Sequence, residues 1–177
     1  ATLPLRYLNK GEKLQLDNPE LDEKMAEVFE NEDLDDNQKK KLEYLFTKNY
    51  PVLTSEKRLD AIAKDLVWHF NDRGYQGKAM FVAIDKPTAV RMHALVMKYL
   101  PLYKDELQRK IKNAQDDQER LQLQKKYGLV DKTEVCVVVS GEQNEVDKFR
   151  KLGLDIEPHR KNMIERNLEK EFKDPDN

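Results

Sequence analysis

The sequence is short of the features that mark secreted and membrane proteins. Its 177 residues include one cysteine, Cys136, which lies in an apolar run. A single cysteine cannot form an intrachain disulfide, and a buried thiol suits a reducing cytoplasm. No stretch approaches the roughly 18 apolar residues that a membrane-spanning helix needs, and no signal-peptide pattern is present. We therefore expect a cytoplasmic protein without a membrane segment.

The sequence also lacks the short motifs of several enzyme classes. It has no Gly-x-x-x-x-Gly-Lys-Ser/Thr phosphate loop, no Gly-x-Gly-x-x-Gly turn and no Gly-x-Ser-x-Gly elbow. The three histidines, His69, His93 and His159, are scattered, and no cysteine–histidine set has metal-ligand spacing. Local motifs alone therefore do not predict an enzyme.

Charge of one sign is not in excess either. The 32 basic and 34 acidic side chains leave a net charge of −2. This balance argues against a chain that coats nucleic acid by its bulk charge, but it leaves room for a local basic groove.

Two apolar runs, residues 78–84 and 134–140, are the clearest strand signals in the chain. The first leads from a glycine turn to Asp85 and then a Pro/Thr helix start, and the second ends at Gly141. Near-continuous apolar runs separated by helices are typical of a parallel sheet covered on both faces. The sequence therefore predicts an α/β fold.

Apolar residues at helical spacing predict the surrounding helices. Three are expected within residues 17–73, one over 88–100 that ends at Pro101, and one over about 143–152. Residues 103–127 have only a thin apolar stripe and predict a long solvated helix or a helical hairpin. A last helix is expected from near Pro158, with Ile164, Leu168 and Phe172 on its apolar face.

Residues 78–92 (KAMFVAIDKPTAVRM) and the segments around them resemble the restriction subunit of type I restriction-modification enzymes. Similar segments follow in the same order along nearly the whole chain: residues 1–8, 54–70, 73–92 and 169–177. The first resembles the entry into that family's second RecA-like motor domain, and the second resembles the helix before the motif IV strand of that domain. The third resembles the motif IV strand with the helix after it. The fourth resembles the end of the helix before the motif V strand. The resemblance rests on the order and combination of these segments.

The resemblance implies a truncated RecA-like parallel sheet with flanking helices and an N-terminal helical segment. It divides the chain into residues 1–73, a leading segment with helices, and residues 74–177, a partial second RecA-like domain with a helical excursion at 103–127. The intact subunit is similar to superfamily 2 helicases. It uses ATP and magnesium to translocate double-stranded DNA, cleaves that DNA, and works with specificity and methyltransferase subunits.

The family's nuclease residues, Walker motifs and motifs V and VI have no counterpart in this sequence and would lie before residue 1 or after residue 177. We therefore expect a fragment that is inactive alone and binds no cofactor by itself. The start at Ala1, without Met, and the end at Asn177 fit the same expectation.

Six residues that follow the two apolar runs are the candidate DNA contacts: Asp85, Lys86, Thr88, Arg91, Ser140 and Gly141. Thr88 and the N–H groups of a helix start can bind a phosphate, Lys86 and Arg91 add positive charge, and Gly141 allows close approach. The same residues also admit a structural interpretation, in which Asp85 and Thr88 cap the helix and the basic side chains are only solvated.

Two other functions stay open at this point. The chain could belong to the motor of another helicase-like nucleic-acid remodeller. It could also be a non-enzymatic interaction module that binds a protein partner through the helices of residues 17–73 and 103–127.

Overall fold

The computed structural model describes residues 37, 49–73 and 77–174. The chain divides into two compact units, residues 1–50 and 51–177, and nearly all of the described residues belong to the second. Most of the first two helices predicted within residues 17–73 lies outside the described residues.

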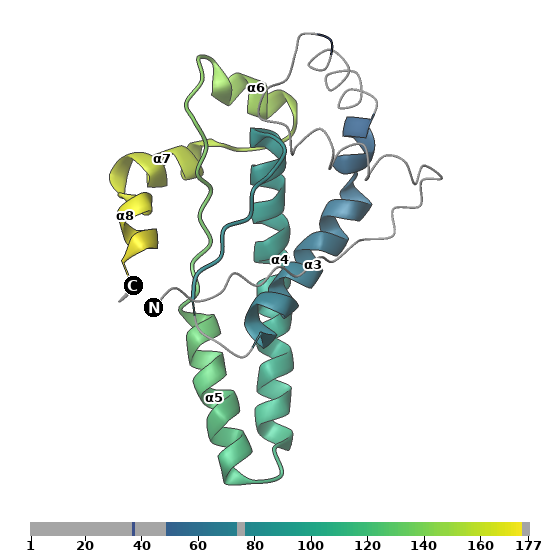
Figure 1. The fold of residues 1–177 in the computed structure, drawn as a ribbon, viewed down its shortest axis with the longest axis vertical. Helices are drawn as coiled ribbons and strands as arrows, with labels where there is room; N and C mark the ends of the chain where they lie inside the picture. The colour runs from purple at the N-terminus through teal and green to yellow at the C-terminus, as the bar shows by residue number, and fades with distance from the viewer. Residues whose placement is uncertain (1–36, 38–48, 74–76, 175–177) are drawn as a thin grey trace. The chain divides into compact units, whose positions relative to one another are not determined.

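The second unit contains three long helices: α3 (Glu56–Asp72), α4 (Lys86–Asn113) and α5 (Asp117–Asp131). Helix α3 buries Leu59, Ala63 and Val67, which recur every four residues and therefore share one face. Helix α4 packs against α3 along its middle, from Met92 to Glu106, and against α5 along its C-terminal half (Figure 1).

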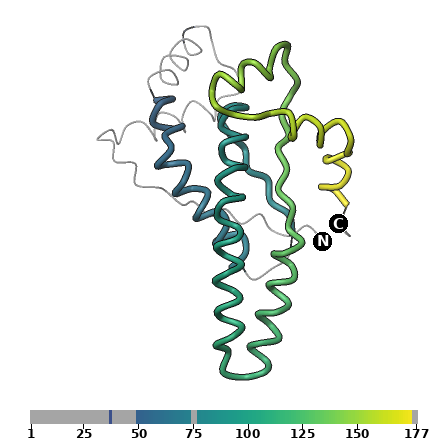
Figure 2. The backbone as a smooth tube through the Cα atoms, turned by 180° about the vertical axis from the view of Figure 1, so that it is seen from behind, coloured from purple at the N-terminus to yellow at the C-terminus, as the bar shows by residue number. Residues whose placement is uncertain are grey.

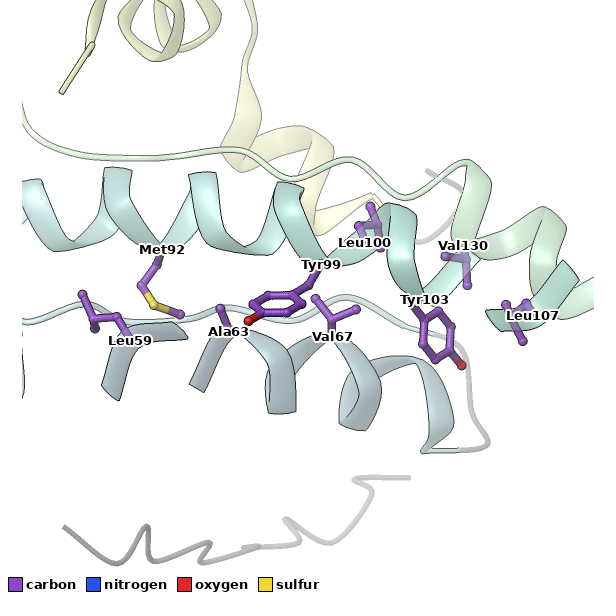
Figure 3. Close-up of a cluster of buried hydrophobic side chains, with 9 residues drawn as sticks. All are labelled: Leu59, Ala63, Val67, Met92, Tyr99, Leu100, Tyr103, Leu107 and Val130. Carbon is purple, nitrogen blue, oxygen red and sulfur yellow. The ribbon is translucent and has the colours of Figure 1, made fainter. Parts of the chain in front are cut away.

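The side chains between these helices form the first hydrophobic cluster (Figure 3), with nine buried members: Leu59, Ala63, Val67, Met92, Tyr99, Leu100, Tyr103, Leu107 and Val130. Trp68 packs edge-on against Tyr103, with ring centroids 5.4 Å apart. Its indole nitrogen donates to Glu106 Oε2 at 2.9 Å, so the polar end of this large side chain has a partner.

Helices α4 and α5 form an antiparallel hairpin that extends beyond the other described helices (Figures 1 and 2). The turn at its tip is fixed by a reciprocal capping pair. Asp116 accepts a hydrogen bond from the Glu119 backbone N–H at 2.7 Å, and Glu119 accepts one from Gln115 N at 3.0 Å. Such side-chain caps satisfy the N–H groups that a helix start leaves unpaired. Of the two alternatives for residues 103–127, the hairpin is therefore the one observed.

Three short helices follow: α6 (Glu145–Lys151), α7 (Glu157–Glu165) and α8 (Leu168–Lys173). A second buried cluster consists of Val90 of α4, Val137, Phe149 of α6 and Ile156, which directly precedes α7. Helix α4 thus contributes to both clusters, with Val90 in the second and Met92 to Leu107 in the first.

The predicted RecA-like parallel sheet is wrong for the part of the chain that the structure describes, because no strand is present in it. Residues 78–84 and 134–140 are extended, but they do not form a ladder. Neither segment is covered on both faces: Met80 is 74 %, Val82 82 % and Val138 70 % exposed, although Val137 is buried in the second cluster. A parallel sheet needs both faces covered, and the apolar runs specify only the extended backbone.

Side chains, rather than neighbouring strands, contact the backbone of the second extended segment. His93 Nε2 lies 3.1 Å from Val135 O, and Val139 N donates to Met163 Sδ at 3.3 Å. Cys136 in this segment is exposed, although the predicted strand would have buried it. Partial desolvation still raises the pKa of its thiol, which disfavours a reactive thiolate.

Two predicted helix boundaries also differ from the structure. Pro101 lies inside α4 rather than at its end, because apolar contacts on both sides of it continue the helix into the hairpin. The predicted last helix is instead two short helices, which are interrupted at residues 166–167. Ile164 is 76 % exposed, so the predicted apolar face does not lie in a core.

Candidate nucleic-acid interface

The start of α4 is held by a side-chain cap. Asp85 is the N-cap residue, and its Oδ1 accepts the Thr88 N–H at 2.7 Å. Thr88 is buried, and its hydroxyl oxygen has no hydrogen-bond partner among the described residues. The cap therefore already uses the N–H group that the sequence offered to a phosphate, and the Asp85 carboxylate adds negative charge beside it.

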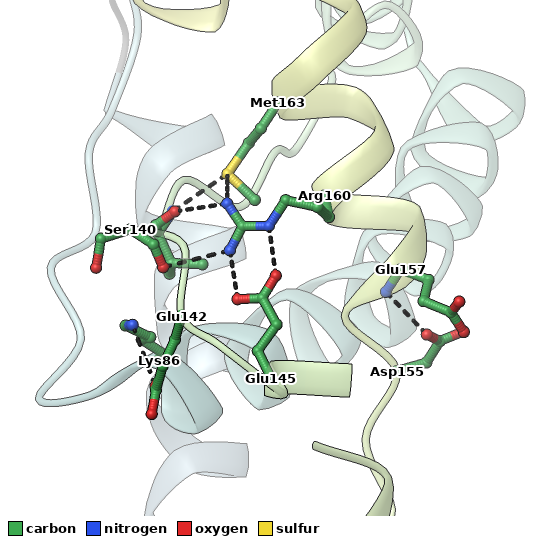
Figure 4. A network of polar contacts seen from close by, with 9 residues as sticks. Lys86, Ser140, Glu142, Glu145, Asp155, Glu157, Arg160 and Met163 are labelled. Atoms are coloured by element: carbon green, nitrogen blue, oxygen red, sulfur yellow. Dashed lines mark hydrogen bonds and ion pairs between the residues drawn. The ribbon is translucent and has the colours of Figure 1, made fainter. Parts of the chain in front are cut away.

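Lys86, the next residue, belongs to a small charge cluster, which we call the Glu142 cluster: Lys86, Glu142 and Lys148 (Figure 4 draws its Lys86–Glu142 pair). Lys86 Nζ lies 3.4 Å from Glu142 Oε2, and Lys148 pairs with the other carboxylate oxygen. These contacts, chiefly the hydrogen bond from Lys148, lower the pKa of Glu142. Two ammonium groups share one carboxylate, so the cluster carries a net positive charge.

Ser140 and Gly141 lie directly before this cluster and are exposed. The Lys86–Glu142 pair therefore joins the start of α4 to the end of the second extended segment, as the candidate site required. A Cβ on Gly141 would meet no atom within 4 Å. The surface beside Gly141 is open to an approaching backbone.

Arg160 of α7 holds the end of this segment in place (Figure 4). Its guanidinium donates to both carboxylate oxygens of Glu145 at 2.7 Å, and also to Val139 O at 3.1 Å and Ser140 O at 3.3 Å. The bond from Arg160 lowers the pKa of Glu145. A fork that binds a carboxylate with two parallel bonds fixes geometry as well as charge.

Arg91 is the candidate residue that the structure does not bring to this place. It follows Lys86 by five positions on α4, which turns it about 140° around the helix axis from Lys86. It makes no hydrogen bond or ion pair with any described residue. The candidate interface therefore consists of the Glu142 cluster with the exposed Ser140-Gly141 segment.

Sequence reasoning missed Glu142, Lys148 and Arg160. Glu142 directly follows the run that ends at Gly141, so its position was a usable signal. No sequence signal could have identified Lys148 and Arg160, because their contacts depend on how α6 and α7 turn back toward the extended segment.

The phosphate loop is absent from the sequence, and no group of three or more His, Cys, Asp or Glu side chains in the described ranges could hold a metal ion. Within the same ranges, no helix is long and apolar enough to cross a membrane.

Comparison with known proteins gives one distant relative. The chain is 26% identical over 179 aligned positions to a Methanocaldococcus jannaschii protein described as "Putative type I restriction enzyme MjaIXP endonuclease subunit". The match covers 99% of this chain and 14% of that protein, so the chain spans about a seventh of the relative's length. No family model matches the chain, and no solved structure does. The chain thus has weak similarity to a type I restriction enzyme endonuclease subunit.

Proposed function

We propose that this chain is a segment of an ATP-dependent DNA-translocating and DNA-cleaving subunit of a type I restriction enzyme, and that its own contribution is a contact to duplex DNA. The Glu142 cluster and the Ser140-Gly141 segment form that contact. Specificity and methyltransferase subunits are the proposed partners of the whole protein.

The observation that carries the DNA contact is the pairing of Lys86 with Glu142. It places a basic helix start beside an exposed glycine and brings in a second lysine, Lys148. Lysine ammonium groups bind phosphates as point charges, and a glycine lets a phosphate backbone approach closely. The weak similarity to an endonuclease subunit supports DNA as the ligand.

The proposed roles of the six predicted residues follow from their positions. Lys86 contacts a phosphate, Ser140 and Gly141 border it, and Lys148 joins them. Asp85 and Thr88 position Lys86 by capping α4. Arg91 lies on another side of α4. Its proposed role is to add to the positive electrostatic potential near the DNA rather than to contact the same phosphate. ATP and magnesium are proposed to bind elsewhere in the whole protein.

The test is the binding of a labelled DNA duplex to the 177-residue chain, measured by fluorescence anisotropy over a range of salt concentrations. Lys86→Ala and Lys148→Ala should each weaken binding about three- to tenfold, and each should reduce the slope of log K against log salt by about 1. Lys173→Ala removes an equally charged side chain from α8, where it pairs with Glu169, and should change neither quantity. Unchanged affinity in both test variants, or no binding by the wild type at low salt, would contradict the proposal.

An interaction module remains a second candidate function, because α5 has an uncovered face with its own chemistry. That face is independent of the Glu142 cluster and leads to the next inference.

A further inference from the structure

Helix α5 has two different faces. Leu123, Tyr127 and Val130 face α4 and pack against the first cluster. About half a turn away lies a second set, which we call the outer face of α5: Leu121, Lys125, Gly128, Leu129 and Lys132. Leu121 is 52 % and Leu129 46 % exposed. About half of each side chain is therefore open to solvent.

No contact with a described residue requires a glycine at position 128. Gly128 lies inside a helix, where glycine is about 1 kcal/mol less favourable than alanine. A Cβ at this position would meet no atom within 4 Å. The missing side chain therefore does not serve packing within the described chain. An open hollow of about 310 Å³ lies on the surface here, lined by Lys125, Gly128, Leu129 and Lys132.

The charged side chains of α5 are paired on the face toward α3 and α4, and those on the outer face pair with no described residue. On the side toward α3 and α4, Lys126 pairs with Asp72, and Asp131 pairs with Lys104 at 2.8 Å. Lys125 and Lys132, which border the hollow, make no ion pair or hydrogen bond through their side chains with any described residue. Their positive charge is therefore uncompensated on the face that also exposes two leucines.

We propose that the outer face of α5 is a docking site for an acidic amphipathic helix of a partner protein. The hollow at Gly128 admits an apolar side chain of the partner beside Leu129, a second apolar side chain contacts Leu121, and the partner's carboxylates pair with Lys125 and Lys132. This is the helix-in-groove mode of recognition, in which anchors recur every three or four residues. The inference does not depend on the proposed DNA contact.

The apolar residues on this face favour a protein over a nucleic acid. A phosphate backbone offers nothing to Leu121 and Leu129, which lie about 12 Å apart along the helix axis. Stacking of unpaired bases requires exposed aromatic rings. Tyr127, the aromatic residue of α5, faces α4, and its hydroxyl accepts a hydrogen bond from Gln108 at 2.9 Å.

The probe is a fluorescein-labelled helical peptide of about 20 residues, long enough to be helical in water. It consists of leucine, glutamate and alanine, with leucines at every third and fourth position and glutamates beside them. A matched peptide carries lysine in place of every glutamate. Binding of each to the 177-residue chain is measured by anisotropy, and folding of each variant by circular dichroism.

We expect the acidic peptide to bind and the basic peptide not to bind. Gly128→Leu fills the hollow and should weaken binding about tenfold. Gly128→Ala should weaken it by a smaller factor while raising the thermal midpoint, since alanine favours the helix and meets no atom. The double charge reversal Lys125→Glu/Lys132→Glu should also weaken binding about tenfold. Lys112→Glu, near the end of α4, is the matched control and should leave affinity unchanged.

Several results would overturn the proposal. These are equal affinity for the two peptides, no binding of either, and unchanged affinity in folded Gly128 variants. Self-association of the chain that Gly128→Leu abolishes would identify a second copy as the occupant. Displacement of the peptide by a DNA duplex, with loss of duplex binding in Gly128→Leu, would identify nucleic acid instead.

Discussion

Glu142 is the residue on which the candidate DNA site depends most directly, because its carboxylate occupies the two lysines that a phosphate would contact. Glu142→Gln keeps the shape of the side chain and removes its charge. We expect duplex affinity to rise severalfold. The slope of log K against log salt should become steeper by about 1, since one more lysine charge is free to neutralise a phosphate and release its counterion. Anisotropy titrations at several salt concentrations measure both.

The control is Glu169→Gln, which removes the carboxylate of an exposed pair with Lys173 and should not alter binding. If Glu142→Gln weakened binding instead, Glu142 would be needed to hold the lysines in position and would not compete with the DNA.

His159 should make the stability of the fold depend on pH. Its ring lies edge-on against His93, with centroids 4.5 Å apart. Burial, followed by the nearby His93, lowers the pKa of His159 below its ordinary 6.5, and Asp155 opposes this shift. The unfolded chain then binds the proton more tightly than the folded chain. The contribution of His159 to the free energy of unfolding should therefore be fully present above about pH 6.5. It should be lost as the pH drops through the lowered pKa.

Urea unfolding at about pH 8 and about pH 5.5 measures this dependence in wild type and in His159→Gln. The variant should lose less stability between the two pH values than the wild type does. His69→Gln, on the exposed side of α3, is the control and should keep the wild-type dependence. An unchanged pH dependence in His159→Gln would show that other groups cause it.

The contacts of some single residues could be predicted from the sequence, and those of others could not. Asp85 before Pro87 and Thr88 is a local cap pattern, and the structure has that cap. The contact between Lys86 and Glu142 joins positions 56 apart, so no local pattern could predict it. The juxtaposition of the 85–88 and 140–141 segments was predicted from a sheet that is absent from the described residues. It arises instead from the second cluster, in which Val90 packs with Val137.

At the scale of an element, Pro101 is the residue in α4 that most opposes helix formation. It removes the hydrogen bond that would run to the carbonyl of residue 97, and its ring crowds that carbonyl. Pro101→Ala should therefore stabilise the chain. The gain is about 1–3 kcal/mol after allowing for the greater freedom of the unfolded chain.

The free energy of unfolding in urea measures this gain. Leu102→Ala, beside it and 49 % exposed, removes a side chain without changing the backbone and should alter stability far less. A loss of stability in Pro101→Ala would mean that α4 needs the bend that a proline introduces.

Helices with a wide apolar stripe were predictable, and boundaries set by tertiary packing were not. The four-residue spacing of Leu59, Ala63 and Val67 predicts α3. Pro101 predicts an end to the preceding helix, but packing of Tyr103 and Leu107 in the first cluster outweighs it. The apolar runs 78–84 and 134–140 predict buried strands of a parallel sheet, and this prediction is wrong for the described residues. Whether such segments pair depends on neighbours that no local pattern contains.

At the scale of the whole molecule, the exposed extended segments make self-association the main hazard. Val82 and Val138 are apolar, β-branched and largely exposed, and unpaired extended backbone is a template for pairing with another chain. Val82→Lys and Val138→Lys should each reduce aggregation, measured by light scattering at rising protein concentration. Neither should lower the free energy of unfolding by more than about 0.5 kcal/mol.

The matched control is Ile164→Lys, which removes an equally exposed apolar side chain from helix α7. A helix satisfies its own backbone groups, so this change should reduce aggregation less. Equal effects of the three substitutions would attribute the aggregation to exposed apolar area alone.

The α4–α5 hairpin has a consequence for the lengths that related chains can have. Its last residue from α4 in the first cluster is Leu107, and its only buried residue from α5 is Val130. The chain leaves and returns at the same place, and Leu123 is the first residue of α5 that packs against the first cluster. Paired insertions or deletions between Leu107 and Leu123 therefore move the tip without disturbing either cluster. One turn removed from each helix would shorten the hairpin by about 5.4 Å. The reach of the tip is thus set by a count of helical turns, and it can vary while the packing at the base stays the same.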